Sequence, residues 1–333
     1  MSHPTSSNQT VLVTGAAGFI GWRFAESAAA RGHTVIGVDK TEHYAARSEH
    51  VPPAFGALID RDALESELPR LKGRVSAVVH LGACANTMET DWSFLERVNV
   101  RYSQMLWNFC REERIPFVYA SSAATYGEGL QGYEDDEERA HALIPLNLYG
   151  RSKLEFDLWA LAEEKAGRTP PAWAGFKFFN VYGFGERHKG RMASVVLHAF
   201  DQIQRTGGVK LFRSHKAGIG DGEQKRDFIW VDDVVEALHF AMEKPIRRGI
   251  YNLGTGQART FLDLTRAVFR ALGRSEKIEF IDTPVEIRDK YQYFTEARMA
   301  RLRAVGFTRP FTPLEEGVAR TVARLQESRT KTP

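Results

Sequence analysis

Residues 11–21 read VLVTGAAGFIG, a four-residue apolar run that stops at a stretch with a glycine at every third position. A helical pattern follows as far as Arg31, and Gly32-His33 leads into a second apolar run, Thr34–Val38, which ends in Asp39. This order predicts a strand, a glycine-rich turn, a helix and a second strand. Such a parallel β-α-β connection is nearly always right-handed.

Apolar runs and helical patterns keep alternating through the first half of the chain. Further strands are expected over residues 76–81, 117–120 and 174–179, with helices around 62–71 and 92–114. This alternation predicts an α/β fold, a Rossmann-type doubly wound parallel sheet over residues 1–180. After Asn180 the order becomes irregular, so residues 181–333 are expected to form a smaller mixed α/β substrate lobe, from which residues of about 225–257 return to the first domain.

The glycines of the first turn suit a dinucleotide site. Gly15 permits the tight turn, Gly18 lets the backbone approach a pyrophosphate, and Gly21 lets the helix pack on the strand. The N–H groups at the helix start would then face the phosphates. The spacing is G-x-x-G-x-x-G rather than G-x-G-x-x-G, but the turn follows a strand and opens a helix, as that fingerprint requires. We therefore expect dinucleotide binding.

The residues after the second strand give opposite indications about which dinucleotide is bound. Asp39 lies where an acid would bind the ribose diol of NAD, whereas Lys40 could bind the 2′-phosphate of NADP. From these two residues alone the choice stays open.

The composition is that of an ordinary globular protein. The 333 residues are 43% hydrophobic, and the formal net charge of +3 is too small to indicate a nucleic-acid partner, although it suits an anionic small ligand. No apolar run is long enough to span a membrane, and the polar N-terminus lacks the apolar core of a signal peptide. Cys84 and Cys110 give neither a disulfide framework nor metal-ligand spacing, and both are expected to be buried intracellular thiols. A cytoplasmic protein without a metal is expected.

A phenol and an amine stand at Y-x-x-x-K spacing in residues 149–153, YGRSK. In the first turn of an expected helix, Tyr149 and Lys153 would share one face. An ammonium and a cationic cofactor ring nearby would favour the phenolate, and the pair could then exchange a proton with a sugar or alcohol hydroxyl. On its own, this spacing is more often a solvated helix face. Ser122 follows a central strand at the end where such sheets bind ligands, although a strand end capped by hydroxyls would look the same.

Ser122, Tyr149 and Lys153 together match the Ser-Tyr-Lys set of the extended short-chain dehydrogenase/reductase family, which the chain resembles from Val11 to about residue 320. The glycine turn, the serine, the Tyr-x-x-x-Lys motif and a later Arg-Asp-Phe at 226–228 occur in the order of that family. Its 4,6-dehydratases carry an Asp-Glu pair just after the strand-end hydroxyl. This chain has Ala123-Ala124 there, which cannot move a proton, so a dehydratase is not expected.

A sharper resemblance is to the ADP-L-glycero-D-manno-heptose 6-epimerase family of nucleotide-sugar epimerases. The matching stretches are ASSAATYG from Ala120, FNVYG from Phe179, HKG-x-MASV from His188, KRDF from Lys225 and KYQ-x-FT from Lys290. The resemblance implies an isomerase that inverts C6 of ADP-D-glycero-D-manno-heptose by transient hydride transfer to bound NADP, with a ketone intermediate. It also implies a homo-oligomer and a role in making the heptose of the lipopolysaccharide core. NAD stays open because of Asp39.

The same resemblance makes Lys189 a second acid/base opposite Tyr149. The nicotinamide stays in place, so inversion requires the ketone to present its other face, and its oxygen then points away from the first proton carrier. Two acid/base groups on opposite sides would serve both orientations. The alternative is a solvated basic loop formed by residues 187–191.

The resemblance also assigns the remaining site residues. Those that would line the dinucleotide are Gly15, Gly18, Phe19, Ile20, Gly21, Asp39, Lys40, Leu81, Gly82, Ala83, Cys84, Ala85, Asn99, Tyr149, Lys153, Val181 and Lys189. Those that would contact the ADP-heptose are Ser122, Asn180, Arg191, His198, Phe212, Arg213, Ser214, Arg226 and Tyr291. The guanidinium of Arg226 could bind a diphosphate with two hydrogen bonds.

The chain departs from the family pattern at several of these positions. Arg191 replaces a small serine, Arg213 and Leu81 each replace an acid, and the loop over residues 215–224 is longer. These differences leave the nucleotide base and the exact sugar open. A sugar 4-epimerase or a nucleotide-sugar reductase on the same fold is the nearest rival and would not need Lys189. A non-catalytic dinucleotide-sensing protein is a rival of another class, and the retained Tyr-Lys pair argues against it.

Overall fold

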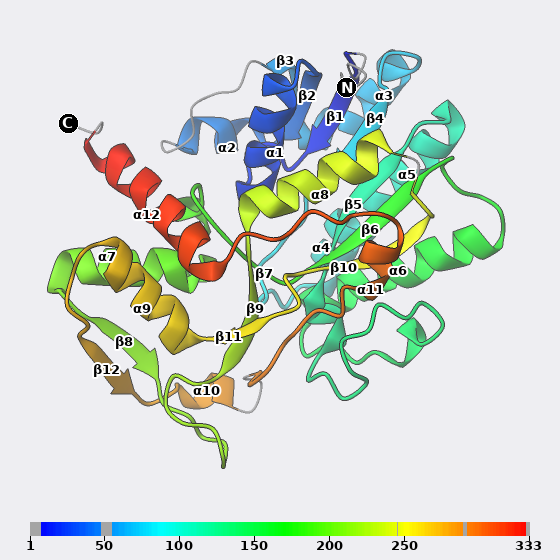
Figure 1. Cartoon of the computed structure of the whole chain (residues 1–333). Coiled ribbons are helices and arrows are strands. Elements are labelled where there is room, and N and C mark those ends of the chain that lie inside the picture. The colour runs from blue at the N-terminus through cyan, green and yellow to red at the C-terminus, as the bar shows by residue number, and fades with distance from the viewer. Residues whose placement is uncertain (1–7, 48–54, 245, 289–291, 331–333) are drawn as a thin grey trace.

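Seven parallel strands build the central sheet of the structure, a computed structural model that describes residues 8–47, 55–244, 246–288 and 292–330 (Figure 1). In spatial order the strands are β10 (Gly249–Leu253), β6 (Trp173–Phe178), β5 (Phe117–Ser122), β4 (Ala77–His80), β1 (Thr10–Thr14), β2 (Thr34–Asp39) and β3 (Phe55–Asp60). The chain order reverses between β1 and β4. The carboxyl ends of these two strands therefore flank the crevice in which sheets of this kind bind ligands.

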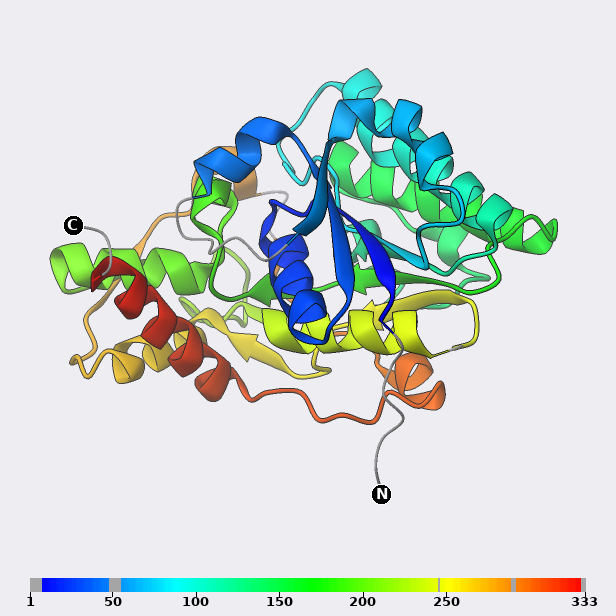
Figure 2. The same ribbon diagram turned by 90° about the horizontal axis from the view of Figure 1, so that it is seen from above.

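Helices cover both faces of this sheet (Figure 2). One face carries α1 (Phe19–Ala30) and α8 (Val231–Glu243), and the other carries α3 (Leu64–Leu71), α5 (Tyr102–Glu113) and α6 (Leu148–Lys165). Strand β1 is apolar at successive positions because both of its faces are covered: Val11 and Val13 pack into the core under α1 and α8, whereas Leu12 packs into the core under the other three helices.

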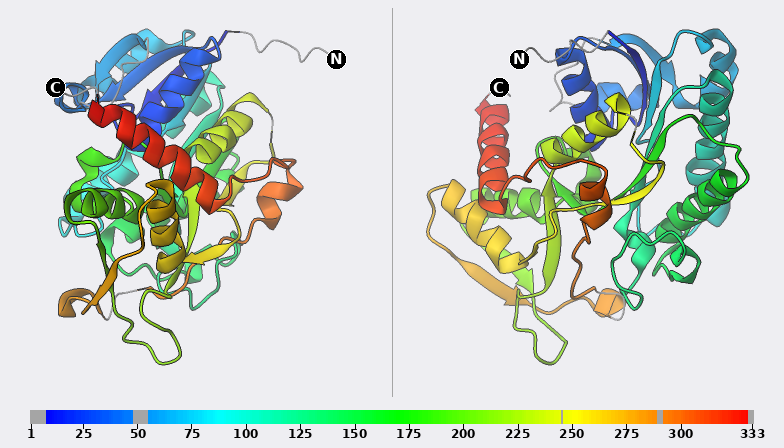
Figure 3. Two further views of the ribbon diagram at one scale, coloured as in Figure 1. Left: turned by 60° about the vertical axis from the view of Figure 1, so that its left-hand side comes forward. Right: turned by 45° about the vertical axis from the view of Figure 1, so that its right-hand side comes forward.

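The second half of the chain builds the smaller lobe (Figure 3). Its two small sheets have the orders β11 (Ala258–Thr260), β9 (Lys225–Trp230), β7 (Asn180–Tyr182) and β12 (Ile278–Ile281), β8 (Val209–Phe212). The helices α7 (Val195–Thr206), α9 (Phe261–Ala271) and α12 (Leu314–Thr330) surround a separate core in which Phe200, Val268 and Val318 are fully buried. The remaining short helices are α2 (Thr41–Ala46), α4 (Trp92–Leu95), α10 (Val285–Arg288) and α11 (Ala300–Ala304), with a π-helical turn at Glu96–Arg101 and 3-10 turns at Arg61–Ala63, Ala123–Tyr126, Ala140–Ala142 and Arg187–Met192.

The chain returns to the large sheet after β9. Helix α8 packs beside α1, and β10 pairs in parallel with β6, with Gly249 opposite Ala174. Helix α8 and strand β10 therefore belong to the layers of the large sheet, although their neighbours in sequence, β9 and β11, belong to the smaller lobe.

The predicted fold class is confirmed. Of the two edge strands of the large sheet, β3 was not foreseen, whereas β10 falls within the residues of about 225–257 that were expected to return to the first domain. The segment of β3 begins with the apolar run FGALI at residues 55–59, which the sequence analysis did not take as a strand. Its side chains are half-buried or exposed because β3 lies at the edge of the sheet. Within the described residues, every helix is too short or too polar to cross a membrane.

Candidate active site

Two cavities open at the carboxyl ends of the central strands. The first, of about 520 Å³, extends from the glycine turn to Tyr149 and Lys189. The second, of about 720 Å³, lies between the loop after β4 and Arg226. Both are lined by Ser122, Tyr149, Phe178 and Phe179. Ligands in the two cavities would therefore meet at Ser122 and Tyr149.

Close backbone packing explains two of the three glycines in the first turn. Gly15 has a φ of +68°, and a Cβ there would lie 2.7 Å from the backbone nitrogen of Gly82. A Cβ on Gly21 would lie 2.0 Å from the carbonyl oxygen of Gly15. Gly18 is the N-cap of α1 and has no side chain to cap the helix, so the first N–H groups of α1 are left to bind an anion.

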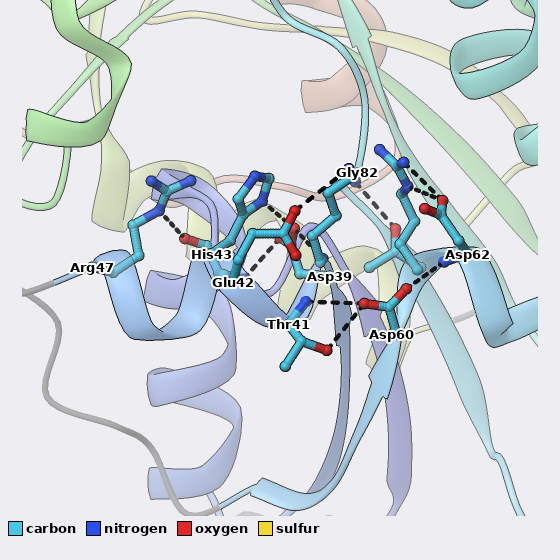
Figure 4. A network of polar contacts seen from close by, with 12 residues as sticks. Asp39, Thr41, Glu42, His43, Arg47, Asp60, Asp62 and Gly82 are labelled. Carbon is cyan, nitrogen blue, oxygen red and sulfur yellow. Dashed lines mark hydrogen bonds and ion pairs between the residues drawn. The ribbon is translucent and has the colours of Figure 1, made fainter.

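The carboxylate of Asp39 uses both oxygens to bind protein groups (Figure 4). Its Oδ2 accepts a hydrogen bond from the Ala17 N–H at 3.0 Å. Its Oδ1 accepts one from the Lys40 N–H at 2.8 Å and lies 2.7 Å from His43 Nδ1. The side chain of Lys40 lies 3.5 Å from Glu42 and does not line either cavity.

Three other basic side chains line this end of the first cavity. They are His43 and Arg47, on or next to α2, and Arg61, directly after β3. Arg47 is oriented by a 3.1 Å hydrogen bond from its Nε to the Ala17 carbonyl oxygen. The sequence analysis missed these residues. Arg61 reaches this end of the cavity because β3 pairs with β2, with Asp60 opposite Asp39. His43 instead follows Asp39 by four residues, a spacing that allows side-chain contact in a helical turn.

Tyr149 lies in the first turn of α6, as its sequence predicts. The helix begins after Asn147, whose Oδ1 accepts a 2.8 Å hydrogen bond from the Gly150 N–H. Burial raises the pKa of the Tyr149 phenol, and a hydrogen bond with Ser122 acts in the opposite direction. Ser122 and Tyr149 both line the two cavities, so their hydroxyl groups belong to one shared wall.

By themselves, the groups of the protein raise the pKa of Tyr149. The expectation from the sequence was that the ammonium of Lys153 and a cationic cofactor ring would together favour the phenolate. In the structure Lys153 Nζ donates a 2.9 Å hydrogen bond to the Ala120 carbonyl oxygen, and burial lowers the pKa of Lys153 to about 8 against the attraction of Asp157. Burial therefore makes both charged forms costly, and it outweighs any stabilisation of the phenolate by the protein itself.

A buried ion pair lies directly behind this site. Lys177 Nζ is 2.6 Å from Asp157 Oδ2 and donates a 2.7 Å hydrogen bond to the Thr125 hydroxyl. The Asp157 carboxylate also accepts hydrogen bonds from Tyr119 and Ser121 at 2.9 and 2.7 Å. Lys177 and Asp157 are 3% and 0% exposed, so their charges are stable only as a pair.

Cys84 and Asn99 shape the wall of the first cavity from behind. Asn99 accepts a hydrogen bond from the Cys84 N–H at 2.8 Å and donates to the Cys84 carbonyl oxygen at 3.0 Å. It also donates to the Ser152 hydroxyl of α6 at 2.9 Å. Neither residue lines the cavity. Cys110 is buried as expected, whereas Cys84 is only half-buried, because it stands in the loop at the cavity edge.

Lys189 lines the first cavity from the 3-10 turn Arg187–Met192. Its Nζ lies 3.0 Å from Glu186 Oε2 and 5.1 Å from the centre of the Phe19 ring. Glu186 is 1% exposed. The sequence analysis did not single out Glu186, although it precedes Lys189 by three residues, a spacing that allows side-chain contact in a helical turn.

The structure brings together most of the predicted dinucleotide residues and fewer of the predicted substrate residues. The first cavity is lined by Gly15, Gly18, Phe19, Ile20, Gly21, Asp39, Leu81, Gly82, Ala83, Ala85, Ser122, Tyr149, Lys153, Val181 and Lys189. The second is lined by Ser122, Tyr149, Asn180 and Arg226. Arg191, His198, Phe212, Arg213 and Ser214 line neither, and Tyr291 lies outside the described residues.

The second cavity is also lined by polar residues that the sequence analysis did not name. They are Thr87, Glu89, Thr90, Asn147, Arg151, Gln292 and Thr295. Gln292 Nε2 donates a hydrogen bond to the Gly127 carbonyl oxygen, and Arg226 donates one to the Gln292 carbonyl oxygen. These bonds bring residues of three distant segments to one wall, which no local pattern could indicate.

Residues 11–254 match the model of the NAD dependent epimerase/dehydratase family. The chain belongs to this family. A curated relative from Fusobacterium nucleatum, named ADP-L-glycero-D-manno-heptose-6-epimerase, is 44% identical over 319 residues, which cover 92% of this chain and 95% of the relative. The chain is also similar to the crystal structure of the Helicobacter pylori enzyme of the same name, with 25% sequence identity, a TM-score of 0.80 and an alignment that covers 98% of each chain. A Thermus thermophilus UDP-glucose 4-epimerase in complex with NAD is 26% identical, covers 95% of this chain and 99% of its own, and has a TM-score of 0.76.

The first cavity fits the nicotinamide dinucleotide on which this epimerase family depends. The backbone at Gly15 and Gly18 leaves room for a pyrophosphate at the start of α1. The other end of the cavity reaches Ser122 and Tyr149, where the cofactor would meet a sugar. One group in the described residues has the donor atoms of a metal site, namely His33, His239 and Glu243, and it lines neither cavity.

Proposed function

We propose that this epimerase family member inverts C6 of ADP-D-glycero-D-manno-heptose, giving ADP-L-glycero-D-manno-heptose. The names of the 40–45% identical relatives support this activity. The observation that carries it is the wall shared by the two cavities. Ser122 and Tyr149 line both, so a sugar carbon in the second cavity would lie next to the reactive end of a dinucleotide in the first.

Each residue has a distinct part in the reaction. Tyr149, as the phenolate, takes the proton of the C6 hydroxyl, with Ser122 beside it. A bound nicotinamide would supply a reversible acceptor for the hydride from C6. The resulting ketone presents its other face, and Lys189, which lines the first cavity from the 187–192 turn, then protonates the oxygen in its new position. Lys153 lies too deep to touch the sugar directly and acts by its charge.

Arg226 is the residue we assign to the diphosphate of the substrate. It lines the second cavity, and its backbone lies in β9, which is paired with β7 next to Asn180. The guanidinium is held over the Phe261 ring at 5.6 Å, and its two terminal nitrogens donate hydrogen bonds to the carbonyl oxygens of Lys225 and Gln292. Such restraint lowers the conformational entropy that is lost when the side chain binds an anion.

We assign NADP rather than NAD as the retained cofactor. Both oxygens of Asp39 already bind protein groups, so the carboxylate is poorly placed to accept hydrogen bonds from a ribose diol. His43, Arg47 and Arg61 line the same end of the cavity and would attract a 2′-phosphate. Replacing both Arg47 and Arg61 by alanine should therefore reduce the NADP content of the purified protein. The control variant, Arg70→Ala with Arg205→Ala, changes two arginines away from this cavity and should reduce the NADP content less.

The first experiment is NMR of the purified protein with ADP-D-glycero-D-manno-heptose and no added cofactor. Conversion to a mixture of C6 epimers would establish both the reaction and a retained, recycled dinucleotide. Mass spectrometry of the compound released on denaturation would identify it as NADP or NAD. If no conversion occurs but a dinucleotide is released, the proposed substrate is refuted and the proposed retained cofactor is supported.

The rival activities make a different prediction about Lys189. A sugar 4-epimerase or a reductase should keep full activity in a Lys189→Ala variant, whereas the proposed 6-epimerase should lose at least about 100-fold in kcat, the usual contribution of a general acid or base. A non-catalytic sensor would release a dinucleotide but convert none of the nucleotide sugars. A cytoplasmic location and a homo-oligomer remain predictions, which cell fractionation and light scattering would test.

A further inference from the structure

The carboxylate of Glu186 is the centre around which residues 183–194 fold. Its Oε1 accepts hydrogen bonds from the Gly183 N–H at 3.2 Å and from the Ser194 hydroxyl at 2.6 Å. Its Oε2 accepts from the Ser194 N–H at 2.9 Å and from the Lys189 ammonium at 3.0 Å. The donors thus come from before, within and after the turn that carries Lys189. A carboxylate as buried as this one is stable only with such partners.

The backbone of the turn is shaped so that these donors converge. The Lys189 N–H donates to the Glu186 carbonyl oxygen at 2.9 Å. Gly190 has a φ of +51°, in the left-handed region that glycine tolerates, and its carbonyl oxygen accepts from the Ala193 N–H at 3.2 Å. The chain therefore reverses after Lys189 and brings Ser194 back to the carboxylate. Lys189 is tied to Glu186 by both its backbone and its side chain.

The other side of Lys189 faces the first cavity. Its side chain is 27% exposed, lines that cavity and lies 5.1 Å from the centre of the Phe19 ring. An ammonium at this wall would be repelled by the positive ring of an oxidised nicotinamide. The negative charge of Glu186 at 3.0 Å offsets this repulsion. The pair can therefore place an ammonium next to the cofactor site.

We propose that Glu186 is a positioning residue of the reaction, which holds Lys189 as an ammonium aimed at the C6 oxygen. This inference rests on the proposed epimerisation. In the return half of the reaction an N–H bond of Lys189 breaks and an O–H bond forms on the ketone oxygen, while the hydride taken earlier returns to C6. Lys189 is left as a neutral amine and regains its proton from solvent, to which Tyr149 releases the proton it took in the first half. The cycle consumes no net proton.

The first test is a double-mutant cycle between Glu186→Gln and Lys189→Ala. Loss of a charge-assisted bond predicts that Glu186→Gln lowers kcat roughly 10- to 100-fold, with KM changed by less than about threefold. Glu186→Asp should restore part of the loss. In a Lys189→Ala background the same change should have little further effect. A loss of kcat that persists fully in that background would overturn the inference, because Glu186 would then act through the fold alone.

A matched control is Asp201→Asn, which also turns a carboxylate into an amide near this turn. Asp201 pairs with Arg187 at 2.9 Å on the exposed side and does not contact Lys189. The kcat of the Asp201→Asn variant should stay within about threefold of the wild-type value. Thermal melting of all variants shows whether each one is folded.

A second readout does not depend on turnover. Acylation of lysine amines at pH 8, followed by mass spectrometry, reports how freely each amine reacts, and an ion pair with a buried carboxylate restrains that reaction. Glu186→Gln should increase the labelling of Lys189 several-fold relative to Lys72, which is more than half exposed and far from the site. Unchanged labelling, together with an unchanged kcat, would refute the pairing. Increased labelling in a protein that converts no nucleotide heptose would instead refute the proposed reaction, and with it the role of the pair in that reaction.

Discussion

Replacing Gly21 by alanine should weaken both the fold and the retention of the dinucleotide. In an ordinary helix interior, alanine is more favourable than glycine by about 1 kcal/mol. In α1, however, the added Cβ would lie 2.0 Å from the carbonyl oxygen of Gly15 and 2.7 Å from its carbonyl carbon, where ordinary contact begins at 3.4 Å. Both are backbone atoms, so no change of rotamer can relieve the clash. The helix and the turn must separate by roughly 1 Å or more.

The expected cost follows from this forced separation. Overpacking a close contact usually destabilises a protein by about 1–3 kcal/mol, and a clash with backbone belongs at the upper end of that range. In a chain of this size, about 3 kcal/mol lowers the melting temperature by roughly 6 °C. Gly15 and Gly18 line the first cavity, so their displacement should also reduce the dinucleotide content of the purified protein well below that of the wild type.

Circular dichroism during heating would measure the melting temperature, and chromatography of the acid-released compound would measure the dinucleotide content. Gly273→Ala is the matched control. Gly273 has a φ of +61° and no atom within 4 Å of an added Cβ, so this change should cost about 1 kcal/mol of backbone strain and leave the dinucleotide in place. A Gly21→Ala protein that melts at or above the wild-type temperature with full dinucleotide content would refute the reasoning.

Three further outcomes are expected. Ser122→Ala removes a hydrogen bond that lowers the pKa of Tyr149, so the pKa should rise further, and the rising limb of a kcat–pH profile should move to higher pH. Lys177→Met leaves the fully buried Asp157 carboxylate without its counter-ion, which should cost about 3–5 kcal/mol in denaturant unfolding. Burial, together with Arg31 and His33, lowers the pKa of His239 from its ordinary value of 6.5 to about 3 in the folded protein. As the pH falls below 6.5, His239 therefore takes up a proton in the unfolded chain but not in the folded one. The stability at pH 5 should then be about 2 kcal/mol lower than at pH 7.5 on this account, and His239→Gln should remove that part of the decline.

The central part of the fold could be predicted because its residues obey strong local rules. Strand β1 is covered on both faces, so its sequence is a continuous apolar run. Gly15 and Gly21 are required where α1 closely approaches the turn. The edge strand β3 also contains a short apolar run, FGALI at residues 55–59, yet its side chains are half-buried or exposed and its pairing with β2 comes from the fold. A short apolar run by itself therefore indicates neither an edge position nor a partner strand.

The site could be predicted only as far as motifs reach. The structure brings Ser122 and Tyr149 together as expected, yet the sequence could not show that Lys153 Nζ donates to a backbone carbonyl and that burial dominates both pKa values. Arg47 and Arg61 follow different strands, and they line the same end of the first cavity because β2 pairs with β3. These contacts depend on where distant elements pack, which no spacing within a motif encodes.

The two groups that we assign to proton transfer come from different lobes. One of the connections between the lobes is short and holds these two groups at a fixed separation. Tyr149 stands on α6 beside the large sheet, whereas Lys189 follows β7 of the smaller one. Strand β6 ends at Phe178 and β7 begins at Asn180, so a single residue, Phe179, joins the two sheets. Phe179 is 6% exposed, lines both cavities, and its N–H donates to the Leu253 carbonyl oxygen at 3.1 Å. A rotating ketone needs its two proton carriers at a fixed separation. A one-residue connection, buried and hydrogen-bonded to β10, supplies that rigidity more directly than a long linker would.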